Sequence, residues 1–238
     1  MSKPEITAII PVFNDRASLE KALPASIKLL DAITPRFEII VAEDGSSDGS
    51  ADMVRDFSGK DPRVRLLHSD TRLGRGKALN RAITDAKGEI VCYYDVDLAT
   101  NMQHIKELVS AIQNGADIST GSRLLPSSDT VRTGGREIAS RSYNFLVRFL
   151  LGSRIYDHQC GFKGFRRERI LPLLDKIRSD HWFWDTEILV RAQILGYRVN
   201  EFPVHWRAGK GTTVRLKDVF SMGSSILRLW WQIHVSED

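Results

Sequence analysis

Cysteine is scarce in this sequence, and long apolar runs are missing. The 238 residues include two cysteines, Cys92 and Cys160, which are too few for a disulfide framework, so a reducing compartment is expected. No run of 18 apolar residues occurs without a charge, so we expect no membrane-spanning segment. A predicted strand begins at residue 6 and leaves no room for a secretory signal before it. No spacing of His and Cys indicates a zinc site.

The remaining composition is that of a folded protein with an uneven charge. The chain is 42% hydrophobic and 27% charged, which excludes a mainly disordered or collagen-like protein. Residues 1–122 hold 15 Lys and Arg against 18 Asp and Glu, a net charge of −3, whereas residues 123–238 hold 19 against 12, a net charge of +7. This asymmetry has two interpretations: ordinary surface variation, or contact of the basic half with a polyanion or a membrane surface.

The first half alternates short β-rich runs with longer helical patterns. The apolar, β-branched run at 6–12 is typical of a buried parallel strand. Strand–helix alternation with short connections predicts an α/β fold, with a mostly parallel central sheet and helices on both faces. We expect strands at 6–12, 37–45, 64–68, 89–97 and 117–123. We expect helices at 16–30 (kinked or broken at Pro24), 50–57, after 74–78, and at 101–112.

After residue 123 the pattern changes. The Gly/Ser/Pro-rich segment 126–135 predicts a mobile loop, and an amphipathic basic helix follows at 136–151. Further strands are expected at 159–165 and 197–206, and helices at 184–195 and 214–233. Since no repeat and no linker is apparent, we expect a single domain, 1–238, made of the halves 1–122 and 123–213 and a C-terminal amphipathic helix, 214–238.

Polar side chains follow three predicted strands at the points where they end. Asn14 and Asp15 follow the first strand, Asp44 ends the second, and Asp95 and Asp97 end the fourth. Ligands of open parallel sheets bind beyond the carboxyl ends of the strands. Two carboxylates that converge at such a turn suit Mg²⁺ or Mn²⁺, which takes carboxylate and phosphate oxygens. The acidic pair therefore indicates a metal–diphosphate site, and the alternative is a solvated turn.

Two glycine-containing segments carry further candidates. Ser47 and Asp48 suit capping of the next helix, whereas Asp44 can accept hydrogen bonds from a base or a ribose. Segment 72–78 lacks the spacing of a Walker P-loop. Lys77, near a helix N-terminus, suits a phosphate, and the alternative is a solvated lysine.

Together these motifs resemble a known family. The ordered set comprises P-V-F-N-D (11–15), A-E-D-G-S-S-D (42–48), G-R-G-K-A (74–78), D-V-D-L (95–98) and G-S-R (121–123). It is similar to the nucleotide-sugar half of the family 2 glycosyltransferases with the GT-A fold. The later segments R-E-I-A-S-R, D-H-Q-C-G-F-K, W-F-W-D-T-E-I-L and F-P-V-H-W resemble polyprenyl-phosphate glycosyltransferases, dolichyl-phosphate glucose synthases first and mannose synthases next. The resemblance covers about residues 4 to 234.

The resemblance implies a donor site in the first half, with Mg²⁺ or Mn²⁺ on Asp95 and Asp97. The family's strand-end motif carries Tyr and Glu where this chain has Phe13 and Asp15. Mannose synthases often carry Gln where this chain has Ala99, so water or donor oxygens would complete the metal shell. The implied nucleotide-sugar site comprises Pro11, Phe13, Asp15, Ala42, Asp44, Lys77, Asp95, Val96 and Asp97.

It also implies a lipid-phosphate acceptor in the second half. The implied acceptor-phosphate site comprises Arg123, Arg136, Ser140 and Arg141. Arg136 and Ser140 are four residues apart and share a helix face, and guanidinium groups bind phosphate bidentately. The alternative is a solvated basic face. Relatives carry a lysine-containing phosphate loop where this chain has 211–213, so Lys210, Arg207 or Arg215 would supply its charge.

The implied catalytic set comprises Asp95, Asp97, Arg123, Arg136 and Asp185, and the role of Asp185 has two interpretations. Many family 2 enzymes use an acid here as a base toward a hydroxyl, but a phosphate acceptor is already ionised. We expect Asp185 to bind or position the sugar; the alternative is an acid that favours a helix N-terminus.

We therefore expect an inverting glycosyltransferase that moves a hexose onto a polyprenyl or dolichyl phosphate. UDP-glucose is the favoured donor, and GDP-mannose and UDP-N-acetylglucosamine remain open. One rival is a family 2 enzyme that acts on a hydroxyl with Asp185 or Glu187 as base, and another is a non-catalytic sugar-nucleotide binder that regulates a membrane complex.

Contact with a membrane would be peripheral, at the cytoplasmic face, and no nucleic-acid partner is expected. Phe145 and Phe149 of helix 136–151, and Trp230 and Trp231 near the C-terminus, accompany basic residues as in interfacial helices. The alternative is that these faces pack on the sheet or on another subunit.

Overall fold

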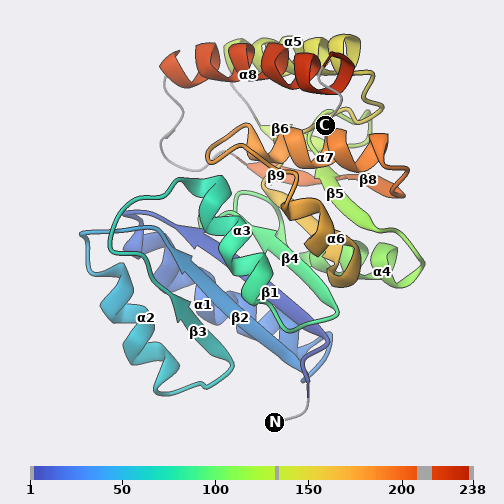
Figure 1. Cartoon of the computed structure of the whole chain (residues 1–238). Coiled ribbons are helices and arrows are strands. Elements are labelled where there is room, and N and C mark those ends of the chain that lie inside the picture. The colour runs from blue at the N-terminus through green and yellow to red at the C-terminus, as the bar shows by residue number, and fades with distance from the viewer. Residues whose placement is uncertain (1–2, 132–133, 208–215, 236–238) are drawn as a thin grey trace.

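A seven-stranded sheet forms the centre of the structure. The computed structural model describes residues 3–131, 134–207 and 216–235. Across the sheet the strands run in the order β3-β2-β1-β4-β7-β5-β8 (Figure 1). Their bounds are Ile6–Val12 (β1), Phe37–Glu43 (β2), Val64–Leu67 (β3), Ile90–Tyr94 (β4), Ile118–Ser122 (β5), Phe162–Arg166 (β7) and Val199–Pro203 (β8).

Strand direction determines where the polar strand ends meet. Strands β3, β2, β1 and β4 run parallel to one another. Strand β7, from the second half of the chain, lies antiparallel between β4 and β5, and β8 is parallel to β5. In this register Val12 pairs with Glu43 and Ile9 with Tyr93. The carboxyl ends of β1, β2 and β4 therefore lie at one edge of the sheet.

Helices cover both faces of the sheet because successive strand residues point to opposite sides. Ile10 belongs to the apolar layer of one face and Ile9 to that of the other. The first face carries α1 (Arg16–Asp31), α2 (Ser50–Ser58) and α4 (Ile105–Gln113, after a short 3₁₀ turn at Met102–His104), and the second carries α3 (Arg75–Asp85), α6 (Arg167–Leu174) and α7 (Trp184–Ile194). The predicted α/β architecture is confirmed.

Two helices of the second half form a further layer. Helices α5 (Gly134–Leu151) and α8 (Leu216–His234) lie side by side at the top of Figure 1, above α7. Val147 of α5 and Ile226 of α8 pack with Phe183 and Val190 at α7. Within the described ranges, no helix combines the length and the apolar character needed to cross a bilayer.

Some local predictions were wrong. Helix α1 continues through Pro24, so a break there is excluded, and the carbonyl that loses its helical partner belongs to the exposed Glu20. The expected mobile loop at 126–135 contains β6 (Asp129–Val131), which pairs with β9 (His205–Arg207), so its partner comes from a distant segment. The expected strand 197–206 divides into β8 and β9, and α6 was not predicted at all.

Gly76 brings α3 close to the segment around α7, and we expect Gly76→Ala to destabilise the fold. A Cβ there would lie 2.7 Å from Trp184 Cβ and 2.8 Å from the Ser179 carbonyl oxygen. Overpacking of this kind costs about 1–3 kcal/mol, whereas alanine in a helix gains up to about 1 kcal/mol over glycine. Urea unfolding measures the change. The control Gly223→Ala on α8, whose Cβ would meet no described atom within 4 Å, should be neutral or stabilising, and equal losses would contradict the packing argument.

Candidate active site

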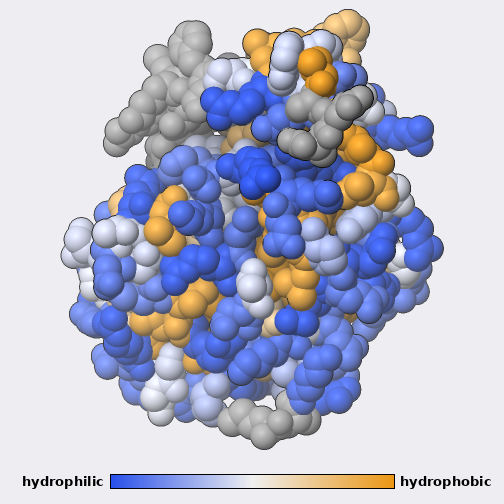
Figure 2. All heavy atoms as spheres, viewed as in Figure 1, coloured by the Kyte–Doolittle hydropathy of each residue, from blue (hydrophilic) through white to orange (hydrophobic). Residues whose placement is uncertain are grey.

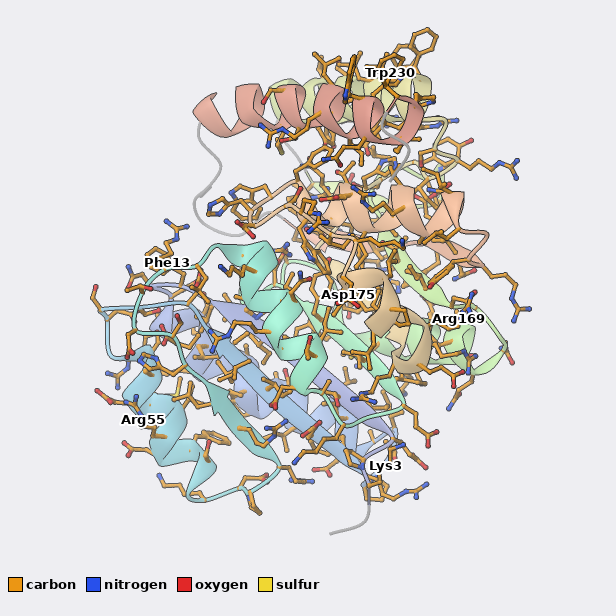
Figure 3. All side chains as sticks on the ribbon, in the orientation of Figure 1. Lys3, Phe13, Arg55, Arg169, Asp175 and Trp230 are labelled. Atoms are coloured by element: carbon orange, nitrogen blue, oxygen red, sulfur yellow. The ribbon has the colours of Figure 1, made fainter. Side chains whose placement is uncertain are left out.

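A pocket lies beyond the carboxyl ends of β1, β2 and β4. Phe13, labelled in Figure 3, lies just after β1 at this edge of the molecule, whereas Lys3 lies at the opposite edge. The pocket also contains Arg72, Arg75 and Trp182, none of which the sequence analysis proposed. Of the nine residues predicted for the nucleotide-sugar site, eight line this one pocket: Pro11, Phe13, Asp15, Ala42, Asp44, Asp95, Val96 and Asp97.

Lys77 is the ninth, and it does not line the pocket. It lies in the first turn of α3, its backbone N–H donates to the Asp180 carbonyl, and its side chain is exposed. The cation nearer the site is Arg75, two residues earlier, at the start of the same helix. The predicted segment therefore reaches the pocket through Arg75, and a contact of Lys77 with a phosphate stays a prediction.

Short polar links hold the end of β1 against the loop after β2. Asn14 adopts a left-handed backbone (φ 51°), and its side-chain oxygen accepts from the Ser47 N–H at 2.8 Å. Asp15 caps α1 by accepting from the Ser18 N–H at 3.2 Å. Asp48 accepts from both the Arg16 N–H and the Ser50 N–H, so it ties the starts of α1 and α2 together. These contacts fix one wall of the pocket.

Asp44 organises the opposite wall. Its buried carboxylate accepts from the Leu73 N–H at 2.7 Å and from the Gly74 N–H at 3.0 Å. Gly74 has φ 103°, a conformation that favours glycine. Asp44 therefore holds the loop that leads into α3 and Arg75, a contact that the sequence interpretation of a base- or ribose-binding carboxylate did not include.

The acidic pair after β4 has one fixed and one more open carboxylate. Asp95 accepts from Arg75 Nη2 at 2.8 Å, and its other oxygen lies against Gly161, where a Cβ would come within 1.9 Å of it. Asp97 is more exposed and accepts from the Ala99 N–H at 3.0 Å. Burial raises the pKa of Asp97, the Ala99 hydrogen bond lowers it in part, and the charges of Asp95 and Asp15 raise it further.

This accumulation of negative charge fits a divalent cation. Asp95 and Asp97 are hard oxygen ligands, and a cation would relieve the repulsion that raises the pKa of Asp97. Among the described residues, no group of three His, Cys, Asp or Glu side chains is arranged to hold a metal. The protein therefore offers a two-carboxylate site that leaves most of a metal's coordination shell to other oxygens.

Asp185 lies outside the pocket lining and beneath it, in a buried charge cluster. It accepts from Arg75 Nη1 at 2.5 Å and from Lys163 Nζ at 2.9 Å, and it also accepts from the Tyr93 hydroxyl. Burial opposes its ionisation, but Arg75 and Lys163 outweigh burial and hold the pKa of Asp185 below its usual range. A carboxylate stabilised in this way is a weak proton acceptor.

Glu187, the other candidate base, forms hydrogen bonds and an ion pair within the fold, away from the pocket. It is buried, and its carboxylate accepts from the Ser179 N–H at 3.0 Å and from Arg191 Nε at 2.8 Å. It therefore joins the loop before α7 to the helix itself, and it does not line the pocket.

The predicted acceptor residues differ in how they are held. Arg123 forms a two-pronged pair with buried Asp157, Nε to Oδ2 at 2.7 Å and Nη2 to Oδ1 at 2.9 Å. The Ser140 hydroxyl is buried without a hydrogen-bond partner among the described residues. Arg141 pairs with Glu137 on the exposed side of α5. The Arg136 side chain lies outside the described part of the structure, although its backbone belongs to α5.

A buried polar relay joins α5 to the loop that carries Asp157. His158 donates from its backbone N–H and from Nδ1 to the Asn144 side-chain oxygen, at 2.9 and 2.7 Å. The Ser153 hydroxyl contacts His158 Nε2 at 2.7 Å. Asn144 lies one turn after Ser140 on α5, and His158 follows Asp157, the partner of Arg123. The Asn144–His158–Ser153 hydrogen bonds thus connect the helix that carries Ser140 with the loop whose Asp157 holds Arg123.

The C-terminal phosphate-loop candidates are largely outside the described residues. Lys210, Arg215 and segment 211–213 fall there. Arg207 is described and pairs with Asp129 across the β6–β9 sheet at 2.6 Å.

With this geometry in place, comparison with known proteins identifies the family. The model of the family described as "Glycosyl transferase family 2" matches residues 7–171. The chain belongs to glycosyl transferase family 2. The resemblance read from the strand-end motifs is therefore confirmed, and the pocket coincides with the strand ends that carry those motifs.

Curated relatives of this glycosyl transferase family 2 chain are similar to nearly all of it, beyond the residues 7–171 that the family model matches. Glycosyltransferase AglD of Haloferax volcanii is 46% identical over 235 residues, 97% of this chain, and the chain spans 38% of that protein's length. The dolichyl-phosphate beta-glucosyltransferase of Dictyostelium discoideum is 31% identical over 94% of this chain and 73% of its own length.

Solved structures agree on the fold. The glucosyl-3-phosphoglycerate synthase of Mycobacterium tuberculosis, solved with Mn²⁺, UDP and glucosyl-3-phosphoglycerate, gives a TM-score of 0.68 at 19% identity over 100% of this chain and 82% of that one. The mannosyltransferase PcManGT of Pyrobaculum calidifontis, solved with GDP-Man and Mn²⁺, gives 0.60 at 21% identity over 90% and 59%. The expected GT-A fold is confirmed.

The buried relay predicts a pH dependence of stability. Burial, aided by Lys163 and Arg148, lowers the pKa of His158 to about 3, well below the usual 6.5. The unfolded chain therefore binds a proton below pH 6.5 that the folded chain excludes, so stability falls as the pH falls. This histidine should account for a loss of about 1.4 kcal/mol between pH 7.5 and 5.5.

Urea unfolding at both pH values tests this effect. His158→Gln should lower stability at pH 7.5 but reduce its dependence on pH. Ser153→Ala is the matched control, because it removes the hydroxyl that contacts His158 Nε2 and that also accepts from the Ile155 N–H and from Gln193 Nε2, and it retains the buried histidine. It should lower stability and keep the dependence, and an unchanged pH slope in His158→Gln would contradict the assignment.

Proposed function

We propose that the chain transfers a hexose from a nucleotide diphosphate sugar to a polyprenyl phosphate, with inversion at the anomeric carbon. The observation that carries the proposal is the strand-end pocket, which gathers Asp95 and Asp97 with the family's donor-side residues. Relatives named as dolichyl-phosphate beta-glucosyltransferases support a lipid-phosphate acceptor. UDP-glucose is the favoured donor, because these relatives are glucosyltransferases by name, and the tests include GDP-mannose and UDP-N-acetylglucosamine.

The donor occupies the pocket along its acidic side. Ala42 and Asp44 lie at the end of β2 and form the wall beside the nucleoside, while Asp95 and Asp97 face the diphosphate. Mg²⁺ or Mn²⁺ held by these two carboxylates supplies Lewis-acid stabilisation of the departing diphosphate. Solved relatives of the same fold carry Mn²⁺ with UDP or GDP-Man, which supports a divalent ion.

The reaction needs positioning more than proton transfer. An oxygen of the acceptor phosphate attacks C1 of the sugar, a bond from that oxygen to C1 forms, and the bond from C1 to the diphosphate oxygen breaks. Because the phosphate is already ionised, no general base is required. This agrees with Asp185, whose carboxylate is held by Arg75 and Lys163. Most of the rate then comes from holding the acceptor in line with the C1–O bond.

The acceptor phosphate binds on the α5 side. The Ser140 hydroxyl supports this, because it is buried with no partner among the described residues, and a buried polar group without a partner is costly unless a ligand satisfies it. Arg123 presents a charge that Asp157 holds in place. Arg136, one helical turn before Ser140, supplies a second guanidinium in this proposal.

Asp97→Asn tests the donor side of the proposal. Purified protein receives each labelled nucleotide sugar with Mn²⁺ or Mg²⁺ and vesicles that contain a polyprenyl phosphate, and lipid-extractable label is counted. Loss of the carboxylate should lower transfer about 100-fold or more, as for other groups that stabilise a leaving anion. Asp56→Asn, an exposed carboxylate on α2, should transfer normally. Label on a soluble sugar acceptor but not on lipid would overturn the phosphate acceptor in favour of a hydroxyl acceptor.

The α5–α8 layer is the membrane-contacting surface in this proposal. Phe145 and Phe149 of α5 are 64% and 74% exposed and stack on each other, and Trp231 of α8 is 58% exposed. Figure 2 shows apolar side chains gathered on this layer at the top of the view, and Figure 3 places Trp230 there as well. Arg141 and Arg228 add positive charge on the same two helices, as anionic lipids require. The inner sides of both helices pack on α7, so the packing alternative holds for one face of each helix.

Vesicle flotation tests the membrane contact. The double variant Phe149→Ser/Trp231→Ser should weaken binding to anionic vesicles by about tenfold, because it removes two exposed aromatic rings from the interface. Ile194→Ser, which removes an exposed apolar side chain of α7 outside the two helices, should bind normally. Equal losses in both variants, or binding that both retain, would contradict the assignment.

A further inference from the structure

Arg75 is shared between the donor pocket and the buried charge cluster. It lies at the start of α3, and its side chain is 14% exposed. One guanidinium nitrogen donates to Asp95 Oδ1 at 2.8 Å, and the other donates to Asp185 Oδ2 at 2.5 Å. A single cation therefore bridges a candidate metal ligand and the fixed carboxylate beneath it.

The two ends of this bridge differ in strength. Asp185 is almost fully buried and has a second cation, Lys163, at 2.9 Å, whereas the Asp95 side chain is 45% exposed. The Asp185 end is thus permanent, and the Asp95 end faces the pocket, where ligands enter. Tyr93 and Trp182 flank the guanidinium, each with its ring centre 5.4 Å away, so Arg75 has little freedom to leave.

A guanidinium at Asp95 competes with a divalent cation for the same carboxylate. The other oxygen of Asp95 lies against Gly161, so the carboxylate cannot turn freely to offer a new face. Beyond Asp95 and Asp97, the described residues provide no third acid, histidine or cysteine for a metal at this point. A metal that enters alone therefore meets one shared carboxylate, one free carboxylate and a fixed positive charge beside them.

We propose that Arg75 is a resident counter-cation that makes metal binding depend on the nucleotide. Without the nucleotide, Arg75 neutralises Asp95 and disfavours a second cation. A nucleoside diphosphate brings two negative charges and oxygen ligands, which offset the charge of Arg75 and complete the metal's coordination shell. Asp185 is a positioning residue in this scheme, because it acts by holding Arg75. The inference rests on the proposed function, since it assigns the metal to Asp95 and Asp97.

Mn²⁺ binding without activity tests this scheme. Free Mn²⁺ is measured by electron paramagnetic resonance in titrations of the full chain, with and without UDP. Wild type should bind Mn²⁺ weakly alone and much more tightly with UDP. Arg75→Gln should bind Mn²⁺ alone about three- to fivefold more tightly than wild type, the scale of one partly exposed ion pair, and should gain less from UDP. Lys163 still neutralises Asp185 in this variant, and circular dichroism verifies the fold.

Arg72→Gln is the matched control. Arg72 lines the same pocket and carries the same charge, but its guanidinium lies over the Phe13 ring at 4.0 Å. Its effect on Mn²⁺ alone should be smaller than that of Arg75→Gln. Equal effects of the two variants, or Arg75→Gln that binds Mn²⁺ alone no better than wild type, would overturn the role of Arg75. Failure of sugar transfer alongside the expected Mn²⁺ pattern would instead count against the proposed function.

Discussion

A buried carboxylate, Asp185, holds the two halves of the chain together at the site. Its partners come from three other elements: Arg75 from α3, Lys163 from β7 and Tyr93 from β4. Two charges in a low-dielectric interior are costly unless each is matched, and removal of one partner of a buried pair typically costs about 3–5 kcal/mol. Lys163 and the Tyr93 hydroxyl also donate to Asp185, and a second guanidinium nitrogen of Arg75 donates to Asp95. The position of Asp95 therefore depends on a group that does not line the pocket.

Much of the fold was predictable because several strands are marked by short apolar runs and turn residues that are contiguous in the sequence. The apolar run at 6–12 is β1 to the residue, and the acidic turns that end β2 and β4 follow directly in the sequence. The insertion of β7 between β4 and β5 was not predictable, because its pairing depends on contacts between segments about 70 residues apart. Strand β6 is a similar case: its sequence is typical of a loop, and β9 supplies the partner that makes it a strand.

The residues of the site show the same difference between local motifs and contacts that are distant in the sequence. Residues carried by a motif at a strand end, such as Asp95 and Asp97, were proposed from the sequence, and the structure places them in one pocket. Arg75 was missed although it stands in the same glycine-rich segment as Lys77. The orientation of a basic side chain at a helix start depends on its partners, and Asp185 lies 110 residues away. A signal was present in the sequence, since Arg75 directly follows Gly74 at the start of the predicted helix. In the structure Gly74 has a positive φ, and Asp44 accepts from the Leu73 and Gly74 N–H groups, so the start of α3 is held beside the pocket.

The structure also shows where the acidic and basic side chains of the two unevenly charged halves lie. The acidic first half places several carboxylates at the pocket, where burial, together with the charges of Asp95 and Asp15, raises the pKa of Asp97. Several arginines of the basic half are already committed to carboxylates: Arg123 to Asp157, and Arg191 to Glu187. Net charge therefore overstates the positive field that a ligand meets. The exposed Arg141 and Arg228 lie on α5 and α8, the layer whose apolar side chains are exposed, so in the proposed function charge attraction and apolar contact with a lipid surface act from the same side of the molecule.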